Sequence, residues 1–294
     1  MTTQKSSAPM VSPVVSPIWL VLIGILSVQL GAGVAKSLFD EVSPTTLVWL
    51  RLVTSAIVLA LIARPALRGR TRQDWWVVLG FGLSLGVMNW AIYQAFARIP
   101  LGIAVTIEFV GPLTLAVLGS RRVRDLLWVA LAAVGVLLLG FERVDLDLVG
   151  VLLALVAGAA WASYILLAKS TGERWPGIDG LAVASVVATL MLTPFAVHAG
   201  GSVLGDPRIL LLGATIGLLS SVIPYTCELV ALRSLRPAVF GILMSLEPAA
   251  AALAGLLVLG EVLSPVQLAA MACVVVASIG ATRSRSTITQ PVPD

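Results

Sequence analysis

The sequence contains little charge and few of the side chains that bind metals or form disulfides. Of its 294 residues, 12% are charged, one is a histidine and two are cysteines. Soluble domains usually carry about 25% charged residues. Cys227 and Cys273 both lie in apolar segments, and His198 stands alone at the end of another. These shortages argue against a soluble domain, a disulfide framework and a metal centre, so we expect no metal and no other cofactor.

The sequence also lacks the motifs of ATP-driven and hydrolytic chemistry. It has no Walker loop and no H-E-x-x-H pair. The stretch GLSLG at 82–86 matches the nucleophile pattern G-x-S-x-G, but it lies inside an apolar run with no histidine base nearby. Gly82 and Gly86 fit a small-residue packing face better. We therefore expect that the protein is not an enzyme and that it has no catalytic residues. The basic residues form short clusters between apolar runs, a pattern that does not indicate nucleic-acid binding.

What the sequence has in abundance is long apolar runs, since 59% of its residues are hydrophobic. The runs are each close to the ~20 residues that a helix needs to cross a membrane. They predict an all-α integral membrane protein in contact with lipid. We expect ten transmembrane helices at 18–39, 44–63, 75–97, 101–120, 126–141, 148–168, 178–198, 208–232, 237–259 and 264–282.

The placement of lysine and arginine predicts the orientation of these spans. With the N-terminus in the cytoplasm, 14 of the 19 basic residues fall in cytoplasmic segments and 4 fall at or near the outer side, while Arg51 lies within a span. Cytoplasmic loops of membrane proteins carry such an excess of positive charge. We therefore predict a multi-pass protein with cytoplasmic tails at 1–17 and 283–294.

Two distant stretches resemble each other. AFARIPLGIAVTIEFVGPLTLAVLG (95–119) parallels ALRSLRPAVFGILMSLEPAAAALAG (231–255), and Pro112 and Pro248 stand 136 positions apart, as do Gly119 and Gly255. They fall in the fourth and ninth spans, which predicts five-helix repeats at 18–141 and 148–282. Because five is odd, the second repeat is inserted upside down. Inverted repeats are typical of transporters, whose substrate site lies near the midplane.

Several short motifs resemble the threonine/homoserine exporters of the EamA-type branch of the drug/metabolite transporter superfamily. They are AKSLF, MNW..Y, PLGIAV..EF.GPL, SRR and MSLEP, and the likeness runs from about residue 18 to residue 282. The resemblance implies ten helices in two inverted repeats in a bacterial inner membrane, and export of small neutral amino acids such as threonine and homoserine. Export of another small metabolite or drug, or a passive channel, are the alternatives.

A few polar residues lie deep in the predicted spans. Charged groups there are costly and usually face a cavity or a partner. Arg51 and Glu108 each lie seven residues from the outer end of their spans, at the same depth of roughly 10 Å. Asn89 lies at a similar depth, with Tyr93 one turn further out, and the second half adds its own polar set. We predict that the substrate contacts Arg51, Asn89, Tyr93, Glu108, Tyr225 and Glu247.

These groups suit an amino-acid zwitterion. Pro112 cannot donate to the carbonyl of Glu108, and Pro224 and Pro248 leave the carbonyls of Ser220 and Met244 free in the same way. A carboxylate beside a free carbonyl suits an ammonium group, while an arginine suits a carboxylate. The sequence therefore predicts a zwitterion site at the level of Glu108.

A carboxylate can also carry the coupling proton, because the chain has no nucleotide motif to supply energy. We expect Glu108, then Glu247 and Glu228, in this role, so that protons are the second partner of an antiporter with alternating access. Structural interpretations of these polar residues remain open. Arg51 and Glu108 can form a structural ion pair, Asn89 and Tyr93 can hydrogen-bond between helices, Glu228 can reach the inner interface, and Glu247 can mark a kink. The sequence does not determine the oligomeric state.

Overall fold

The computed structural model describes residues 16–118, 126–140, 147–200, 203–232, 235 and 237–285, and these ranges contain helices and no strand. The first half comprises α1 (Pro17–Lys36), α2 (Pro44–Ala63), α3 (Arg72–Phe96), α4 (Leu101–Glu108), α5 (Val110–Leu118) and α6 (Leu126–Gly140). The second half comprises α7 (Leu148–Gly172), α8 (Asp179–Gly200), η2 (Val203–Gly205), α9 (Pro207–Gly217), η3 (Leu218–Val222), α10 (Ile223–Leu232), α11 (Pro237–Met244), α12 (Glu247–Ala254), η4 (Gly255–Leu259) and α13 (Pro265–Arg285).

The all-helical membrane architecture is confirmed. Within the described ranges, eight helical segments are long and apolar enough to cross a membrane, and two shorter apolar ones cover Leu101–Leu115 and Leu126–Leu138. These segments overlap the predicted spans. The fourth span is divided into α4 and α5, the eighth into α9, η3 and α10, and the ninth into α11, α12 and η4. Helix α7 runs to Gly172, past the predicted end at residue 168. The tails 1–15 and 286–294 and the basic cluster Arg121, Arg122 and Arg124 lie outside the described residues.

Proline and short polar side chains begin the long helices. Proline suits the first position because its missing N–H would have no partner there; it begins α1, α2, α9 and α13. Ser43 accepts the Thr46 N–H at the start of α2. Thr71 and Asp74 form a reciprocal capping box at the start of α3. These local signals explain why the helix starts follow the sequence closely.

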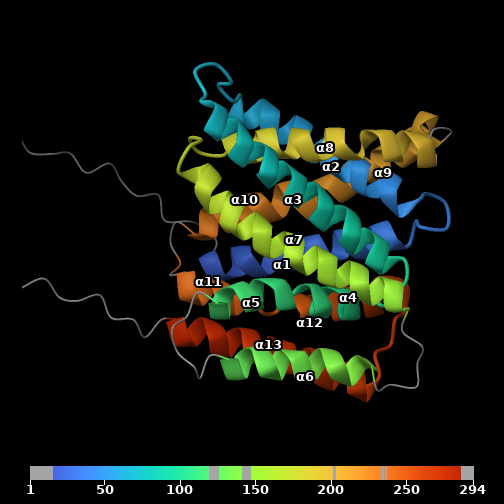
Figure 1. Ribbon diagram of the computed structural model, residues 1–294. Helices are drawn as coiled ribbons and strands as arrows, with labels where there is room; N and C mark the ends of the chain where they lie inside the picture. Colours follow the sequence, from blue (N-terminus) through green and yellow to red (C-terminus); the bar gives the residue numbers. More distant parts are fainter. Residues whose placement is uncertain are drawn as a thin grey trace, which may run out of the picture.

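The helices pair across the two halves of the chain. The main packing pairs are α3 with α7, α1 with α10, α2 with α8, α4 with α12, and α6 with α13, each with one helix from either half. In Figure 1, α6 and α13 form one side of the bundle, and α2 and α8 lie on the opposite side. Glycines allow close approach at these contacts: a side chain on Gly82 or Gly86 would collide with α8. The core therefore lies between the halves.

The bundle has two ends, which we name by one residue each. The Lys36 end is where α1 and α3 finish and α4 begins, at the right of Figure 1. The Arg70 end is the opposite end, where α2 passes into α3. Both ends of the described chain, Ser16 and Arg285, lie at the Arg70 end.

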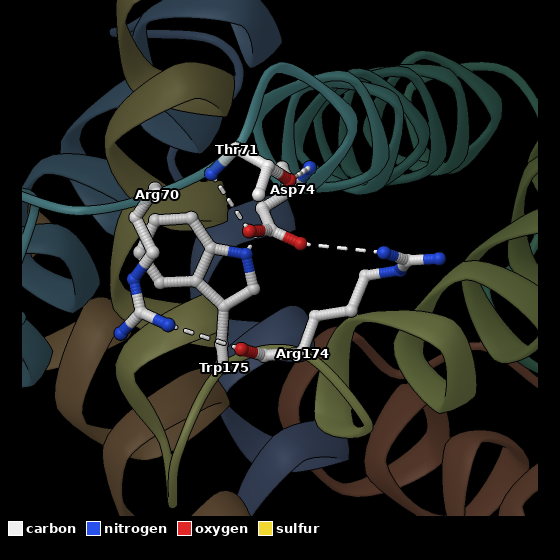
Figure 2. Close-up of polar contacts among 5 residues, drawn as sticks. All are labelled: Arg70, Thr71, Asp74, Arg174 and Trp175. Carbon is white, nitrogen blue, oxygen red and sulfur yellow. Dashed lines mark hydrogen bonds and ion pairs between the residues drawn. The ribbon is translucent and has the colours of Figure 1, made fainter.

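A polar cluster joins the two halves at the Arg70 end (Figure 2). The Arg70 guanidinium lies over the Trp175 ring, with Cζ 4.3 Å from the ring centroid, and its Nη1 donates to the carbonyl of Arg174 at 3.0 Å. Arg174 pairs with Asp74 at 3.3 Å, and the Thr71 N–H donates to the same carboxylate at 2.9 Å. The start of α3 is thereby held against the loop between α7 and α8.

Candidate substrate cavity between the two halves

A cavity of about 400 Å³ lies between the halves, in the size range of small-molecule sites. Helices from both halves contribute to its wall, and most of the wall is apolar. Six of the seven predicted substrate and proton residues line it together: Arg51, Asn89, Glu108, Tyr225, Glu228 and Glu247.

Breaks in two helices lie beside this cavity. The first half is interrupted at Phe109, between α4 and α5, and the second at Ser245 and Leu246, between α11 and α12. Glu108 is the last residue of α4, and Glu247 is the first of α12. The kink considered at Glu247 is therefore present. Broken helices at membrane depth occur where the backbone is covered by protein or lines a cavity.

Arg51 is held by the second half of the chain. Its side chain is buried, with Nε donating to Ser221 Oγ at 3.2 Å and Nη2 donating to the Ser220 carbonyl at 2.8 Å. Both serines belong to the π-helical turn η3. Pro224 has no N–H for the Ser220 carbonyl, so the acceptor predicted to be free is the one that Arg51 binds. The Tyr93 ring lies 5.7 Å from the Arg51 Cζ.

Two details of the predicted zwitterion site are corrected. Arg51 and Glu108 do not form an ion pair, because the guanidinium is directed to Ser220 and Ser221. The Glu108 carbonyl is covered by α7, since a side chain on Gly158 would collide with that oxygen. The predicted cradle of the Glu108 carboxylate and its own carbonyl is therefore not formed. Arg51 and Glu108 both line the cavity, but their side chains are not directed at each other.

Three carboxylates share the cavity wall. Glu108 and Glu247 are each 8% exposed, and Glu228 is half-buried. Among the described residues, none donates a hydrogen bond to these carboxylates or forms an ion pair with them. Among the described residues that line the cavity, Arg51 is the one with a cationic side chain. The wall can therefore bind positive charge, either as protons or as a cationic group of a ligand.

Asn89 and Tyr93 have different positions. Asn89 lines the cavity and donates from Nδ2 to the carbonyl of Leu85 in its own helix at 2.8 Å. Tyr93 is fully buried outside the lining and packs against Phe39 and Phe96, with ring centroids 6.1 and 5.7 Å away. Its hydroxyl has no described hydrogen-bond partner. Tyr93 thus belongs to an aromatic layer on the Lys36 side of the cavity.

The cavity is more exposed toward the Arg70 end. Its lining residues Ala32 and Phe96, near the Lys36 end, are 4% and 3% exposed. Glu228, Phe240 and Thr282, within about one turn of the helix ends at the Arg70 end, are partly exposed.

Ser220 and Ser221 were not predicted as partners of Arg51. The pair of hydroxyl residues just before Pro224 in an apolar span was the signal available.

Lining residues of the two halves recur at one fixed spacing along the sequence. Seven pairs of lining residues are 136 positions apart, the same offset that relates Pro112 to Pro248. They are Val28 and Tyr164, Gln29 and Ile165, Met88 and Pro224, Asn89 and Tyr225, Ile92 and Glu228, Val105 and Gly241, and Glu108 and Met244.

Comparison with known proteins agrees with this architecture. The profile of the EamA-like transporter family matches residues 148–283. The threonine/homoserine exporter RhtA of Escherichia coli (strain K12) is 40% identical over 273 residues, which is 92% of each chain. The chain belongs to the EamA-like transporter family.

Further proteins that are similar to this EamA-family chain differ in sequence identity and in the share of each chain that is matched. RhtA of Salmonella typhimurium (strain LT2) is also 40% identical over 92% of each chain. The uncharacterized transporter YwfM of Bacillus subtilis (strain 168) is 34% identical over 160 residues, which is 53% of each chain. A protein crystal structure with 18% identity has a TM-score of 0.62 and covers 92% of this chain and 99% of its own. The last likeness concerns the fold alone.

Proposed function

We propose that this EamA-family chain is a secondary transporter that exports threonine and homoserine from the bacterial cytoplasm in exchange for protons. The observation that carries the proposal is the cavity, in which one arginine and three carboxylates meet between the halves. The substrate class is supported by the 40% identity to proteins named threonine/homoserine exporters.

The cavity wall suits a zwitterion. The guanidinium of Arg51 has five N–H donors, of which η3 engages the one on Nε and one of the two on Nη2. The remaining donors are available to a substrate carboxylate. Glu108 and Glu247, which lack described partners, are suited to its ammonium group. Asn89 and Tyr225 supply further polar contacts, while Tyr93 acts by closing the cavity.

The architecture is proposed to be ten spans in two inverted repeats. The constant offset of 136 between lining residues and the packing of each helix on one from the other half support this relation. The excess of lysine and arginine in the segments at the Arg70 end supports a cytoplasmic position for that end. Because the cavity is more exposed toward that end, the structure is proposed to be the inward-facing form of an alternating-access cycle, with both termini inside.

Proton coupling is assigned to the same carboxylates. A proton that reaches Glu108 from outside neutralises the carboxylate and releases the ammonium group, and its loss to the cytoplasm restores the site. Glu247 and Glu228 are the second and third choices for this role. Glu108 is the first choice because its predicted depth in the membrane allows it both to bind the substrate and to carry the proton.

Efflux tests the substrate. Cells that produce the protein are loaded with labelled threonine or homoserine, and efflux is followed with and without a proton gradient. We expect faster efflux than in cells that produce Arg51→Leu at the same membrane level, and loss of the difference when the gradient is collapsed. Unchanged efflux of both amino acids would reject this substrate class and leave another small metabolite or drug.

Counterflow in proteoliposomes tests the transport mode. Unlabelled substrate on one side is expected to stimulate movement of labelled substrate from the other, because an alternating-access carrier returns faster when loaded. A passive channel shows no such stimulation.

A further inference from the structure

Three linked contacts lie at the Lys36 end, beyond the aromatic layer, and the two made by Glu261 join the two halves. Lys36, at the end of α1, donates from Nζ to the carbonyl of Ile99 at 2.8 Å and forms an ion pair with Glu261 at 2.5 Å. The other carboxylate oxygen of Glu261 accepts the backbone N–H of Leu101 at 2.8 Å. We name this set, Lys36, Glu261 and the backbone of Ile99 and Leu101, the outer latch.

The local backbone explains why Glu261 reaches α4. Pro100 precedes α4 and offers no side-chain cap, so the N–H of Leu101 at the start of that helix needs an acceptor from elsewhere. Gly260 adopts φ +68° after η4, a left-handed conformation that glycine allows, and turns the chain so that Glu261 N–H donates to the Gly255 carbonyl at 3.1 Å. A carboxylate also suits the positive end of a helix dipole.

The ion pair of the outer latch is less exposed to water than the Arg208–Glu41 ion pair at the same end. The side chains of Lys36 and Glu261 are each 18% exposed, whereas those of Arg208 and Glu41 are 63% and 50% exposed. Exposed pairs contribute little, because water screens them. The latch is better shielded, and each partner makes a second hydrogen bond. The Arg208–Glu41 pair therefore serves as a matched control at the same end.

We propose that the outer latch holds the cavity closed to the outside and must break for the substrate to leave. It ties α1 and the start of α4, in the first half, to the loop between η4 and α13, in the second. Opening at the Lys36 end requires these elements to separate. The inference rests on the proposed alternating access and adds the residues that stabilise its inward-facing state.

The outer latch also affects the position of Glu108 in the cavity, because Glu108 lies at the other end of α4. Glu261 thus acts on the carboxylate through the helix that it caps, as a positioning residue without contact to substrate. Separation of Glu261 from Leu101 frees the start of α4 from the second half.

The accessibility of the cavity from outside tests the outer latch without relying on transport. A single cysteine replaces Ile92 in the cavity wall, in a background in which Cys227 and Cys273 are alanine. Intact cells are treated with a membrane-impermeant maleimide, and the labelling rate is measured. Glu261→Gln keeps the size of the side chain and an acceptor for the Leu101 N–H but removes the ion pair. We expect labelling to rise about fivefold or more, the low end of typical coupling between two states.

Two further variants make the result decisive. Lys36→Met removes the other partner and is expected to raise labelling in the same direction, while Glu41→Gln breaks the exposed control pair and is expected to leave it unchanged. Equal rates in Glu261→Gln, Lys36→Met and Glu41→Gln would overturn the latch. If labelling rises as expected but the wild-type protein exports no threonine or homoserine, the latch stands and the proposed substrate fails.

Discussion

At the residue scale, the decisive feature is that the cationic group of the cavity is positioned by hydrogen bonds from the other half of the chain. Arg51 is held by η3 through one hydroxyl and one carbonyl. A guanidinium fixed by two of its nitrogens presents the third in a defined direction, which favours recognition of a planar carboxylate. The carboxylates in the same cavity wall have no hydrogen-bond donor or ion-pair partner among the described residues, so binding of charge at this site depends on the ligand.

Ser221→Ala tests the positioning of Arg51. Loss of the hydroxyl removes the acceptor of Nε, and hydrogen bonds to charged groups contribute about 1.5–3 kcal/mol. We expect the KM for threonine to rise about tenfold or more with a smaller change in maximal rate, measured by counterflow in proteoliposomes. Ser221→Thr keeps the hydroxyl and is expected to retain most of the wild-type KM. Equal KM values in the two variants would argue against the positioning role.

Glu108→Gln tests the proton assignment. The amide keeps the shape of the side chain and cannot take up or release a proton. Gradient-driven efflux of threonine is expected to be lost, while exchange of labelled for unlabelled threonine survives at a reduced rate. Glu41→Gln, in an exposed ion pair far from the cavity, is the control and should behave as wild type. Efflux by Glu108→Gln that still follows the proton gradient would exclude Glu108 as the carrier and leave Glu247 next.

At the element scale, the break between α4 and α5 depends on close packing by glycine. The carbonyl of Glu108 at this break lies against Gly158 of α7, and Gly111 of α5 approaches the same glycine. The buried break is tolerated because α7 covers it. The same approach explains why α7 carries small residues in its middle turns.

Gly158→Ala should therefore destabilise the protein. A methyl group there would collide with the Glu108 carbonyl, and overpacking typically costs about 1–3 kcal/mol. We expect the thermal midpoint of the detergent-solubilised protein to fall by roughly 2–10 °C. Gly172→Ala in the same helix is the control, because no atom lies within 4 Å of the added carbon. An unchanged midpoint for Gly158→Ala would contradict the packing account.

At the scale of the whole molecule, the two ends of the bundle are joined in different ways. Arg70, Trp175 and Asp74 hold the halves together at one end (Figure 2), and the outer latch does so at the other. The cavity between the halves lies between these two sets of contacts and is more exposed toward the Arg70 end. The proposed alternating-access carrier needs one end to open while the other closes, whereas a static pore does not.

The orientation in the membrane is testable on the whole protein. Single cysteines are placed at the exposed positions Arg68 and Glu41, again with Cys227 and Cys273 replaced by alanine. In intact cells, an impermeant maleimide is expected to label the cysteine at 41 and to label that at 68 only after the membrane is permeabilised. The reverse pattern would invert the predicted topology.

Much of the fold could be predicted because a membrane span is a local property. Each span must satisfy its backbone hydrogen bonds internally and needs about 20 apolar residues, so its position can be read from the chain. The set of polar residues at one depth was predicted for the same reason, since depth is counted along a helix. The starts of the long helices could be predicted as well, because these helices begin at proline or after capping residues such as Ser43 and Thr71.

The sequence by itself determined which polar residues lie within the apolar helices, and the tertiary structure decided which of them meet. Arg51 and Glu108 were predicted to share a depth, yet Arg51 contacts Ser220 and Ser221, which are far away in the sequence. That choice depends on the rotation of each helix about its axis and on the helix packed beside it, here a π-helical turn. Neither quantity is local, because both follow from close packing among all the helices. The outer latch has the same origin, since Glu261 caps a helix 160 residues before it.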